Sequence, residues 1–413
     1  MPKNPKKTIS AVPEPSPHLF NVFRRQPLLF VKGKGAYLWD ADGKRYLDFF
    51  SGLAVTGLGH AHPGVAAAVA RQARTLVHTS NLYYTRPQVE LAAELVKRTF
   101  PGRVFFSNSG AEANECAIKL ARRHGHLTGG RNEIIVFEHA FHGRTLGALS
   151  ATPQEKYRTG FGPLLDGFPV VPFGDLAAVE RAAGANTCAV LVEPIQGEGG
   201  IHTAPPEFFA GLQRLCRDGN LLLMFDEIQT GVGRTGTLFA FQSLKVDPDV
   251  LTMAKGLANG LPIGATIARP EVADLFKPGD HASTFSGGPV VCRAAQAVLK
   301  ALTAAQLKRI AFLGRRFLDE ISSWKKDVPS IVAVRGLGLM IGIELDRPGG
   351  GIVDACRESG LLVNCTADRV IRLLPPFILT DAQASAGLAV LKKVVARIPA
   401  DRRVPLSPES GVL

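Results

Sequence analysis

Residues 221–236 read LLLMFDEIQTGVGRTG, and five apolar residues in this stretch run directly into the acid pair Asp226 and Glu227. An apolar run of this length is typical of a strand that is buried on both faces of a parallel sheet. A carboxylate at the end of such a strand is costly unless a cationic or hydrogen-bonding group meets it. The stretch therefore predicts a buried sheet and a polar partner for Asp226.

Four more apolar runs of strand length alternate with helical patterns: VFF at 104–106, IIVF at 134–137, AVLV at 189–192 and VLTM at 250–253. This alternation predicts a three-layer α/β unit, with a mainly parallel sheet covered by helices on both faces. Beyond residue 310 two helical apolar faces follow, one at Ile310, Leu313, Phe317 and Ile321 and one at Leu388, Leu391, Val395 and Ile398. We expect these helices to form a smaller α/β domain together with the N-terminal segment.

Five segments follow from these patterns. Residues 1–18 hold five prolines and three lysines and predict a flexible arm, and residues 399–413 predict a flexible tail. Between them we expect a large domain at 60–310 and a small domain built from 19–59 and 311–398.

Composition excludes several classes of protein. The chain has 413 residues, of which 46% are hydrophobic, but no apolar run approaches the roughly 18 residues that a membrane helix needs. Its six cysteines are scattered without metal-like spacing, which predicts free thiols in a reducing compartment. The N-terminus lacks the apolar core of a signal peptide, so the cytoplasm is the expected location. The net charge of +12 comes from dispersed Lys and Arg pairs, which favours anionic small molecules over nucleic acid.

Polar, glycine-rich segments follow each of the five apolar runs: SNSGAEANE, EHAFHGRT, EPIQGEGG, DEIQTGVGRTG and AKGLANG. The carboxyl ends of parallel strands meet at one edge of a sheet, and ligands of open α/β sheets bind at that edge. We therefore expect a ligand site where these segments converge.

The segment SNSGAEANE predicts a phosphate cradle. Ser109 and Glu112 have the spacing of a capping box at the start of a helix whose Ala113, Ala117 and Leu120 face inward. The free N–H groups of the first turn, with the helix dipole behind them, suit an anion. An ordinary capped helix is the alternative. Nucleotides are poor candidates because no GK[ST] ending and no GxGxxG motif follows the first strand.

Lys255 follows an apolar strand and precedes a glycine-rich turn. It is either a surface lysine or an amine in a dry crevice, where a lowered pKa would let it attack a carbonyl. Lysine, a phosphate cradle and a buried aspartate together describe a pocket for pyridoxal 5'-phosphate, in which Asp226 would meet the pyridinium nitrogen. Glu227 is interpreted as structural.

From about residue 28 to residue 398 the sequence resembles the class III aminotransferases of the fold type I pyridoxal-phosphate enzymes. The motifs that carry the resemblance are GKGAYLWDADGKRYLDF, GHAHP, HTSNLYY, SGAEANE, FHGRT, VEPIQGEGG, FDEIQTGVGRTG, AKGLANGLPIGA, HASTF and VIRLLPP. The resemblance is strongest to members that move the ω-amino group of N2-acetylornithine to 2-oxoglutarate, as part of arginine biosynthesis.

The resemblance implies roles for individual residues. Lys255 would be the catalytic residue and the covalent anchor of the cofactor, whose other contacts would be Ser109, Gly110, Ala111, Phe141, Asp226, Gln229 and, from the other subunit of a homodimer, Thr284. Arg144 would bind a substrate carboxylate near Ser283 and Asn81. Glu198 and Arg372 would form a switch that lets one pocket accept two unlike substrates, although a structural ion pair is the alternative from the residues alone.

The sequence leaves the amino donor open and is compatible with other classes of protein. Ornithine, succinylornithine, N-succinyl-diaminopimelate or 4-aminobutyrate could be the amino donor, and related mutases share much of the pattern. A sugar-phosphate binder or an inactive binding module would lack a reason for both Lys255 and Asp226. The histidine pairs His60/His62 and His139/His142 have no carboxylate or cysteine at helpful spacing, so we expect no metal site.

Two positions depart from the family pattern. Phe23 stands where many relatives have a tyrosine, which predicts the loss of one hydrogen bond to a substrate carboxylate. HASTFSGGP at 281–289 differs from the commoner HGSTFGGNP and leaves the shape of that loop open.

Overall fold

The computed structural model describes Ser16 and residues 18–397. Apart from Ser16 and His18, the predicted arm at 1–18 lies outside the described residues, as do Ile398 and the predicted tail at 399–413.

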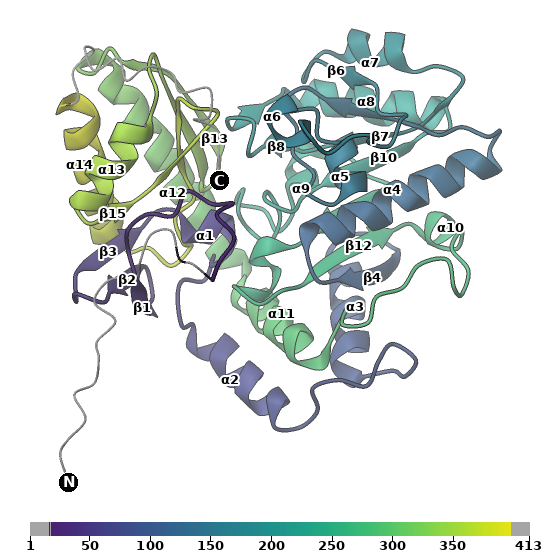
Figure 1. Cartoon of the computed structure of the whole chain (residues 1–413), viewed down its shortest axis with the longest axis horizontal. Helices are drawn as coiled ribbons and strands as arrows, with labels where there is room; N and C mark the ends of the chain where they lie inside the picture. The colour runs from purple at the N-terminus through teal and green to yellow at the C-terminus, as the bar shows by residue number, and fades with distance from the viewer. Residues whose placement is uncertain (1–15, 17, 398–413) are drawn as a thin grey trace.

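A seven-stranded sheet forms the centre of the larger part of the molecule (Figure 1). Its order is β4 (Arg103–Ser107), β12 (Gly264–Ala268), β11 (Val250–Met253), β10 (Leu222–Asp226), β7 (Thr187–Val192), β5 (Glu133–Phe137) and β6 (Val170–Val171). All five apolar runs that predicted strands are strands of this sheet. Strand β12 pairs antiparallel with both β11 and β4, whereas the other pairs are parallel.

Alternate strand residues pack on opposite faces of this sheet. On one face Met224 and Leu191 pack with Ala117 of α4 (Gly110–Leu127). On the other face Phe225 and Val192 belong to a cluster that includes residues of α8 (Pro206–Asp218). The sheet is therefore buried on both sides, which confirms the predicted three-layer arrangement and explains why its strands read as continuous apolar runs.

The remaining helices of the larger part connect these strands or cover the sheet. They are α2 (Pro63–Ala73), α3 (Arg86–Arg98), α5 (Leu146–Ser150), α6 (Glu155–Arg158), α7 (Leu176–Ala182), α9 (Ala240–Leu244), the 3₁₀ helix η1 (Lys255–Ala258), α10 (Pro270–Ala273) and α11 (Pro289–Ala301). A two-stranded hairpin, β8 (Ile195–Gln196) and β9 (His202–Thr203), follows β7.

A smaller unit is built from both chain ends. Strands β1 (Phe30–Lys34), β2 (Tyr37–Asp40) and β3 (Arg45–Asp48) form one sheet with β15 (Leu361–Leu362), in which Leu47 pairs with Leu361. The short helix α1 (Ser51–Ala54) follows β3. A second sheet has the order β13 (Ile331–Leu337), β14 (Met340–Leu345), β17 (Val370–Leu373) and β16 (Asn364–Thr366). This arrangement confirms the predicted smaller α/β unit.

The helices of the smaller unit are α12 (Ala304–Ser323), the 3₁₀ turn η2 (Trp324–Lys326), α13 (Gly350–Glu358) and α14 (Asp381–Arg397). The apolar faces that predicted two helices here are buried: Ile310, Leu313, Phe317 and Ile321 on α12, and Leu388, Leu391 and Val395 on α14.

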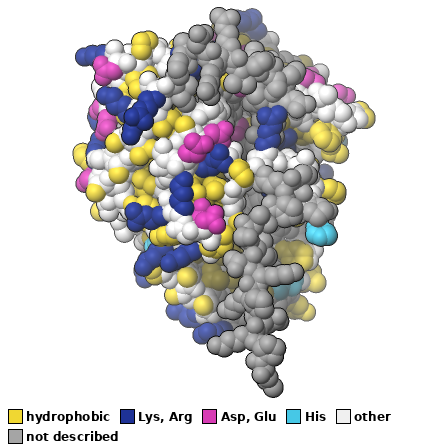
Figure 2. Space-filling model, turned by 60° about the vertical axis from the view of Figure 1, so that its left-hand side comes forward, with side chains coloured by type: hydrophobic (Ala, Val, Ile, Leu, Met, Phe, Trp, Pro, Cys, Tyr) yellow, Lys and Arg dark blue, Asp and Glu magenta, His cyan; other side chains and the backbone are white. Residues whose placement is uncertain are grey.

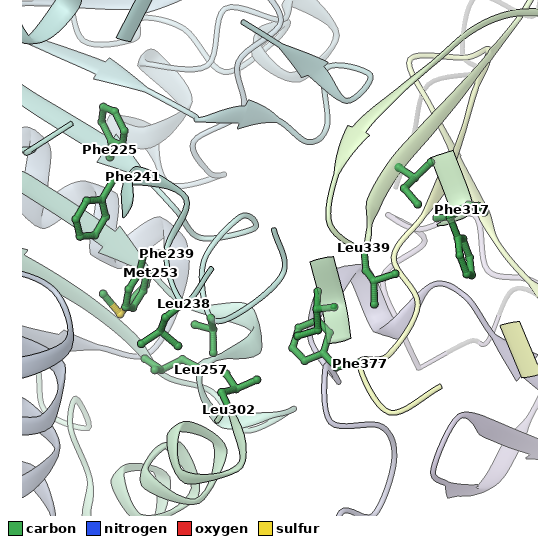
Figure 3. Packing of buried hydrophobic residues seen from close by; sticks show 14 of the residues in the cluster. Phe225, Leu238, Phe239, Phe241, Met253, Leu257, Leu302, Phe317, Leu339 and Phe377 are labelled. Atoms are coloured by element: carbon green, nitrogen blue, oxygen red, sulfur yellow. The ribbon is translucent and has the colours of Figure 1, made fainter. Parts of the chain in front are cut away.

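Arg234 joins the two parts. It lies in the GVGRTG motif and is buried, and its Nη1 donates to the carbonyl oxygens of Leu339 at 2.9 Å and Pro375 at 2.6 Å. Its guanidinium also lies 4.5 Å from the ring centre of Phe377. Figure 3 shows side chains of one apolar cluster on both sides of this junction, among them Leu302, Phe377 and Leu339. The junction is therefore packed as well as hydrogen-bonded.

Surface and cysteine features agree with the composition. On the face shown in Figure 2, the Lys and Arg side chains are scattered among apolar and acidic ones. All six cysteines are free thiols, five buried and Cys365 half-buried. None of the helices within the described ranges is long and apolar enough to cross a membrane.

Candidate active site

A cavity of about 410 Å³ lies at the carboxyl ends of the sheet strands, next to the smaller unit. The segments after β4, β5, β7, β10 and β11 all contribute to its wall. This agrees with the ligand site expected where the five polar, glycine-rich segments converge. The predicted site residues that line it are Ser109, Gly110, Ala111, Phe141, Arg144, Glu198, Asp226, Gln229 and Lys255.

The start of α4 forms one end of the cavity. Ser109 is the N-cap, and its Oγ accepts from the N–H of Glu112 at 3.2 Å. The Glu112 carboxylate accepts from the N–H of Asn108 and not from that of Ser109. The serine half of the predicted capping box is therefore confirmed, but its glutamate half is wrong by one residue. Gly110 and Ala111 line the cavity, and their first-turn N–H groups, which have no acceptor within a helix, suit an anion there.

Two glycines let the neighbouring loops approach this helix start. Gly143 has a φ of +144°, and a Cβ there would lie 2.8 Å from the Cβ of Ala111. A Cβ at Gly264 would lie 2.4 Å from the carbonyl oxygen of Ser109. Any side chain at either position would displace the cradle.

Asp226 ends β10 and is almost completely buried. Its Oδ1 accepts from the N–H of Ile228 at 3.0 Å, and its Oδ2 accepts from Nδ2 of Asn114 at 2.7 Å. The same Oδ2 lies 2.8 Å from Nδ1 of buried His142, and because a carboxylate cannot donate, Nδ1 carries the proton. These contacts hold the Asp226 carboxylate in one orientation toward the cavity. His142 and Asn114 were not predicted as site residues.

Glu227 has a different partner. It is fully buried, and its carboxylate accepts from the N–H groups of Ala240 at 2.6 Å and Phe241 at 2.8 Å, and from Oγ1 of Thr230 at 3.2 Å. Burial raises the pKa of Glu227 to about 7, although these hydrogen bonds oppose the rise. Glu227 therefore caps the start of α9, which agrees with its structural interpretation.

Lys255 directly follows the residue after β11 and has a φ of +38°, a strained value for a residue with a side chain. Its amine has no hydrogen-bond or ion-pair partner within residues 18–397. Burial lowers the pKa of Lys255, Glu198 opposes that shift, and Arg372 adds to it. A strained backbone and a destabilised ammonium group are both typical of a reactive lysine.

Glu198 and Arg372 form a buried pair behind the cavity wall. Nη1 of Arg372 donates to Oε1 of Glu198 at 2.6 Å, and Nη2 donates to Oε2 at 3.4 Å. Arg372 also donates to the carbonyl oxygen of Gly197, to Oδ1 of Asn364 and to Oε1 of Gln229. Burial alone would raise the pKa of Glu198, but Arg372 and Lys255 outweigh it and the pKa is lowered. Glu198 is therefore ionised and faces both cations.

Glu193 is a site residue that was not predicted. It lines the cavity, and its two oxygens accept from the N–H groups of Phe141 at 3.1 Å and Gly197 at 3.3 Å. These bonds connect the loop that carries Phe141 and Arg144 to the loop that carries Glu198. Burial, followed by the nearby Asp226 carboxylate, raises the pKa of Glu193 well above its usual value.

Arg144 lies at the open side of the cavity, where it is exposed to solvent. Its guanidinium lies 5.7 Å from the ring centre of Phe141 and 4.0 Å from that of Tyr157. It forms no ion pair within the described part of the chain. A permanent cation held by two aromatic rings and lacking an acidic partner suits a ligand carboxylate.

Four predicted site residues do not line the cavity of their own chain. Arg372 lies behind Glu198. Thr284 is exposed, and Ser283 accepts from Nδ2 of Asn108 at 3.2 Å. Asn81 holds the loop that carries Ser283 and Thr284, since its Nδ2 donates to the carbonyl oxygens of Ser283 and Ser286. Phe23 is exposed as well and does not reach the cavity.

Sequence and structure comparisons agree on one family. The family model described as aminotransferase class-III matches residues 21–395. The chain belongs to the class III aminotransferases. It is 46% identical over 385 residues to an acetylornithine aminotransferase of Caldanaerobacter subterraneus, covering 92% of this chain and 98% of that relative. It is 47% identical to the acetylornithine aminotransferase of Methanothermobacter thermautotrophicus, covering 92% and 96%.

Solved structures with this fold include ornithine and acetylornithine aminotransferases. An ornithine aminotransferase from Toxoplasma gondii matches with a TM-score of 0.86 and 35% identity, over 90% of this chain and 91% of the other. An acetylornithine aminotransferase from Elizabethkingia anophelis matches with a TM-score of 0.82 and 32% identity, over 92% and 97%.

The cavity of this class III aminotransferase fits the pyridoxal phosphate on which the family depends. The free N–H groups at the start of α4 suit the phosphate, the fixed Asp226 suits a protonated ring nitrogen, and the unpaired amine of Lys255 suits the aldehyde carbon. A metal ion is not part of this chemistry, and nowhere in residues 18–397 do three His, Cys, Asp or Glu side chains gather as metal ligands.

Proposed function

We propose that this aminotransferase moves the ω-amino group of N2-acetylornithine to 2-oxoglutarate by a ping-pong reaction, giving N-acetylglutamate 5-semialdehyde and glutamate, in arginine biosynthesis. The names of the relatives at 46% and 47% identity support the donor. The observation that carries the proposal is the arrangement of two arginines around Lys255: Arg144 unpaired at the open side, and Arg372 neutralised by Glu198 inside.

Besides Lys255, the cofactor would be held by residues on three strand ends. Ser109, Gly110 and Ala111 would bind the phosphate, Phe141 and Gln229 would contact the ring, and Asp226 would keep the ring nitrogen protonated. When bound, pyridoxal phosphate supplies the electron sink that allows a bond at the substrate carbon to break.

Lys255 is the residue that we propose moves the proton. Its lowered pKa leaves a larger share of its amine uncharged near neutral pH, so Nζ would accept a proton from the substrate carbon bearing the amino group and return it to the C4′ carbon of the bound cofactor. His142 and Asn114 hold Asp226 in place while charge changes nearby.

Glu198 and Arg372 would let one cavity serve two substrates. With the ω-amino donor, Glu198 stays on Arg372 and Arg144 takes the donor's only carboxylate. With glutamate, Glu198 moves aside, Arg372 takes the α-carboxylate and Arg144 takes the distal one. The close, buried pair supports this role because a carboxylate ligand can replace Glu198 without leaving Arg372 unpaired.

We also propose a homodimer in which Thr284 of each subunit completes the partner's phosphate site. Thr284 lies outside its own cavity, on a loop bordered by exposed apolar side chains: Leu82 is 87% exposed, Tyr84 93% and Phe285 70%. A patch of this kind is typical of a covered interface. Ser283 and Asn81, which shape that loop, would act near the substrate in the same way. The domain limits 19–59, 60–310 and 311–398 and a cytoplasmic location remain predictions.

A donor panel tests the proposed function. The purified enzyme is assayed with 2-oxoglutarate and with N-acetylornithine, ornithine, N-succinylornithine, N-succinyl-diaminopimelate or 4-aminobutyrate. We expect the highest kcat/KM with N-acetylornithine. Ornithine is the alternative that the structural similarity to ornithine aminotransferases favours, and a higher kcat/KM with ornithine would replace the proposed donor.

A further inference from the structure

Two cations flank the ring of Tyr157. The guanidinium carbon of Arg144 lies 4.0 Å from the centre of this ring, and Nζ of Lys156 lies 4.7 Å from it. The two cations are therefore no farther apart than the sum of these distances. Tyr157 itself is buried on the short helix α6, and both cations lie at its ring.

Lys156 lacks an acidic partner of its own. Within residues 18–397 neither Lys156 nor Arg144 forms an ion pair. Glu198 and Asp368 act on Lys156 electrostatically, but Glu198 is bonded to Arg372. Partial burial lowers the pKa of Lys156, Glu198 opposes that shift and Arg144 adds to it. Lys156 does not itself line the cavity, but it lies beside Arg144, which does.

A second cation beside Arg144 changes what the cavity accepts. If Arg144 takes the α-carboxylate of the donor, as the proposed function holds, the donor's α-nitrogen lies on the carbon next to that carboxylate, and Lys156 is the second cation at the same Tyr157 ring. In ornithine this nitrogen is an ammonium group, which Lys156 repels. In an N-acylated donor it is a neutral amide, so the repulsion is absent and the attraction for the carboxylate remains.

We propose that Lys156 is a specificity-determining residue that disfavours amino donors with a free α-ammonium group and favours those whose α-nitrogen is acylated. This inference rests on the proposed function for the position of the carboxylate. It does not depend on which acyl group the donor carries, and an acyl group with its own carboxylate would be accepted as well.

The test compares kcat/KM for N-acetylornithine with kcat/KM for ornithine. In Lys156→Gln this ratio should fall several-fold, because the variant removes the repulsion of the α-ammonium group of ornithine and N-acetylornithine has no such charge. Lys156→Glu should lower the ratio further. Lys308→Gln removes another exposed lysine, on α12, and should leave the ratio unchanged.

The dependence of this kcat/KM ratio on ionic strength provides a second test, in the unaltered enzyme. Added salt screens exposed charges, so the ratio should fall as ionic strength rises, and it should change less in Lys156→Gln. A ratio that stays constant in both Lys156 variants, or a loss by the same factor for both donors, overturns the proposal.

Failure of the proposed function gives a different result. If the wild-type enzyme uses ornithine and not N-acetylornithine, the proposed donor is wrong. The ornithine rate then still tests Lys156 when it is divided by the rate with 4-aminobutyrate, which has a carboxylate and no α-ammonium group: this ratio must rise in Lys156→Gln if Lys156 repels the α-ammonium group. An unchanged or lower value would overturn the inference by itself.

Discussion

Removing one partner of the Glu198–Arg372 pair should affect the two halves of the reaction unequally. Glu198→Ala leaves Arg372 with neutral partners only, the Gly197 carbonyl, Asn364 and Gln229. Glutamate then finds Arg372 free, so its half-reaction should be spared or improved. The ω-amino donor meets an exposed charge that it cannot satisfy, so its half-reaction should slow.

The size of the effect follows from the bonds between the pair. Arg372 makes hydrogen bonds of 2.6 and 3.4 Å to Glu198, and charge-assisted bonds of this kind contribute about 1.5 to 3 kcal/mol each. Loss of one such bond corresponds to about a 10- to 150-fold change in rate or binding. We expect a decrease of this size for the donor half in Glu198→Ala. Arg372→Ala should produce a decrease of this size for the glutamate half and a smaller one for the donor half.

Single-turnover measurements separate the halves, because each substrate alone converts the enzyme once. Asp354→Ala is the control: it breaks the exposed Asp354–Arg357 pair on α13, which does not line the cavity, and both halves should keep their rates. If Glu198→Ala and Arg372→Ala each slow both halves by one common factor, the pair is structural and the switch is wrong.

Three further predictions concern the buried acids. Asp226→Asn should retain cofactor but lose turnover by about 100- to 1,000-fold, since about 4 kcal/mol of attraction for a protonated ring nitrogen is lost; near-normal kcat in that variant would reassign Asp226. Glu193→Gln replaces one of the two oxygens that accept from the Phe141 and Gly197 N–H groups with an NH₂ donor, which loosens the loop that carries Phe141. The apoenzyme should therefore bind pyridoxal phosphate about 10-fold more weakly in a titration. An unchanged Kd would contradict the positioning role of Glu193. The contribution of Glu227 to the free energy of unfolding should be fully present below its usual pKa of 4.5, and up to about 3 kcal/mol of it should be lost as pH rises through about 7. The difference in Tm between wild type and Glu227→Gln should therefore fall between pH 4.5 and 8. A constant difference would refute the raised pKa.

Local sequence patterns predicted the sheet well because its strands are buried on both faces. The run before Asp226 is a strand for that reason, and Ser109 caps α4 as its spacing predicted. Strand β12 was not among the predicted runs, and its antiparallel direction could not have been predicted from composition, because a buried strand has the same apolar composition whichever way it runs.

The residues that hold the site together were harder to predict. Asn114, His142 and Glu193 act through contacts with segments far away in the sequence, 112 residues in the case of Asn114 and Asp226. Glu193 did have a signal: it follows the apolar run at 189–192 as Asp226 follows its own strand. Asn114 gave a weaker signal: it is a polar residue next to Ala113, which was predicted to face inward on the helix that is now α4. Their partners became visible only in the folded chain.

The central claim is that Lys255 holds the cofactor. The protein is loaded with pyridoxal phosphate, reduced with borohydride, digested and sequenced by mass spectrometry, with Lys255→Ala treated in parallel. We expect a yellow protein that loses its colour on reduction and carries one pyridoxyl phosphate group on Lys255, with no stable label in the variant. A protein that stays colourless with the cofactor, or a label on another lysine in the wild type, would contradict it.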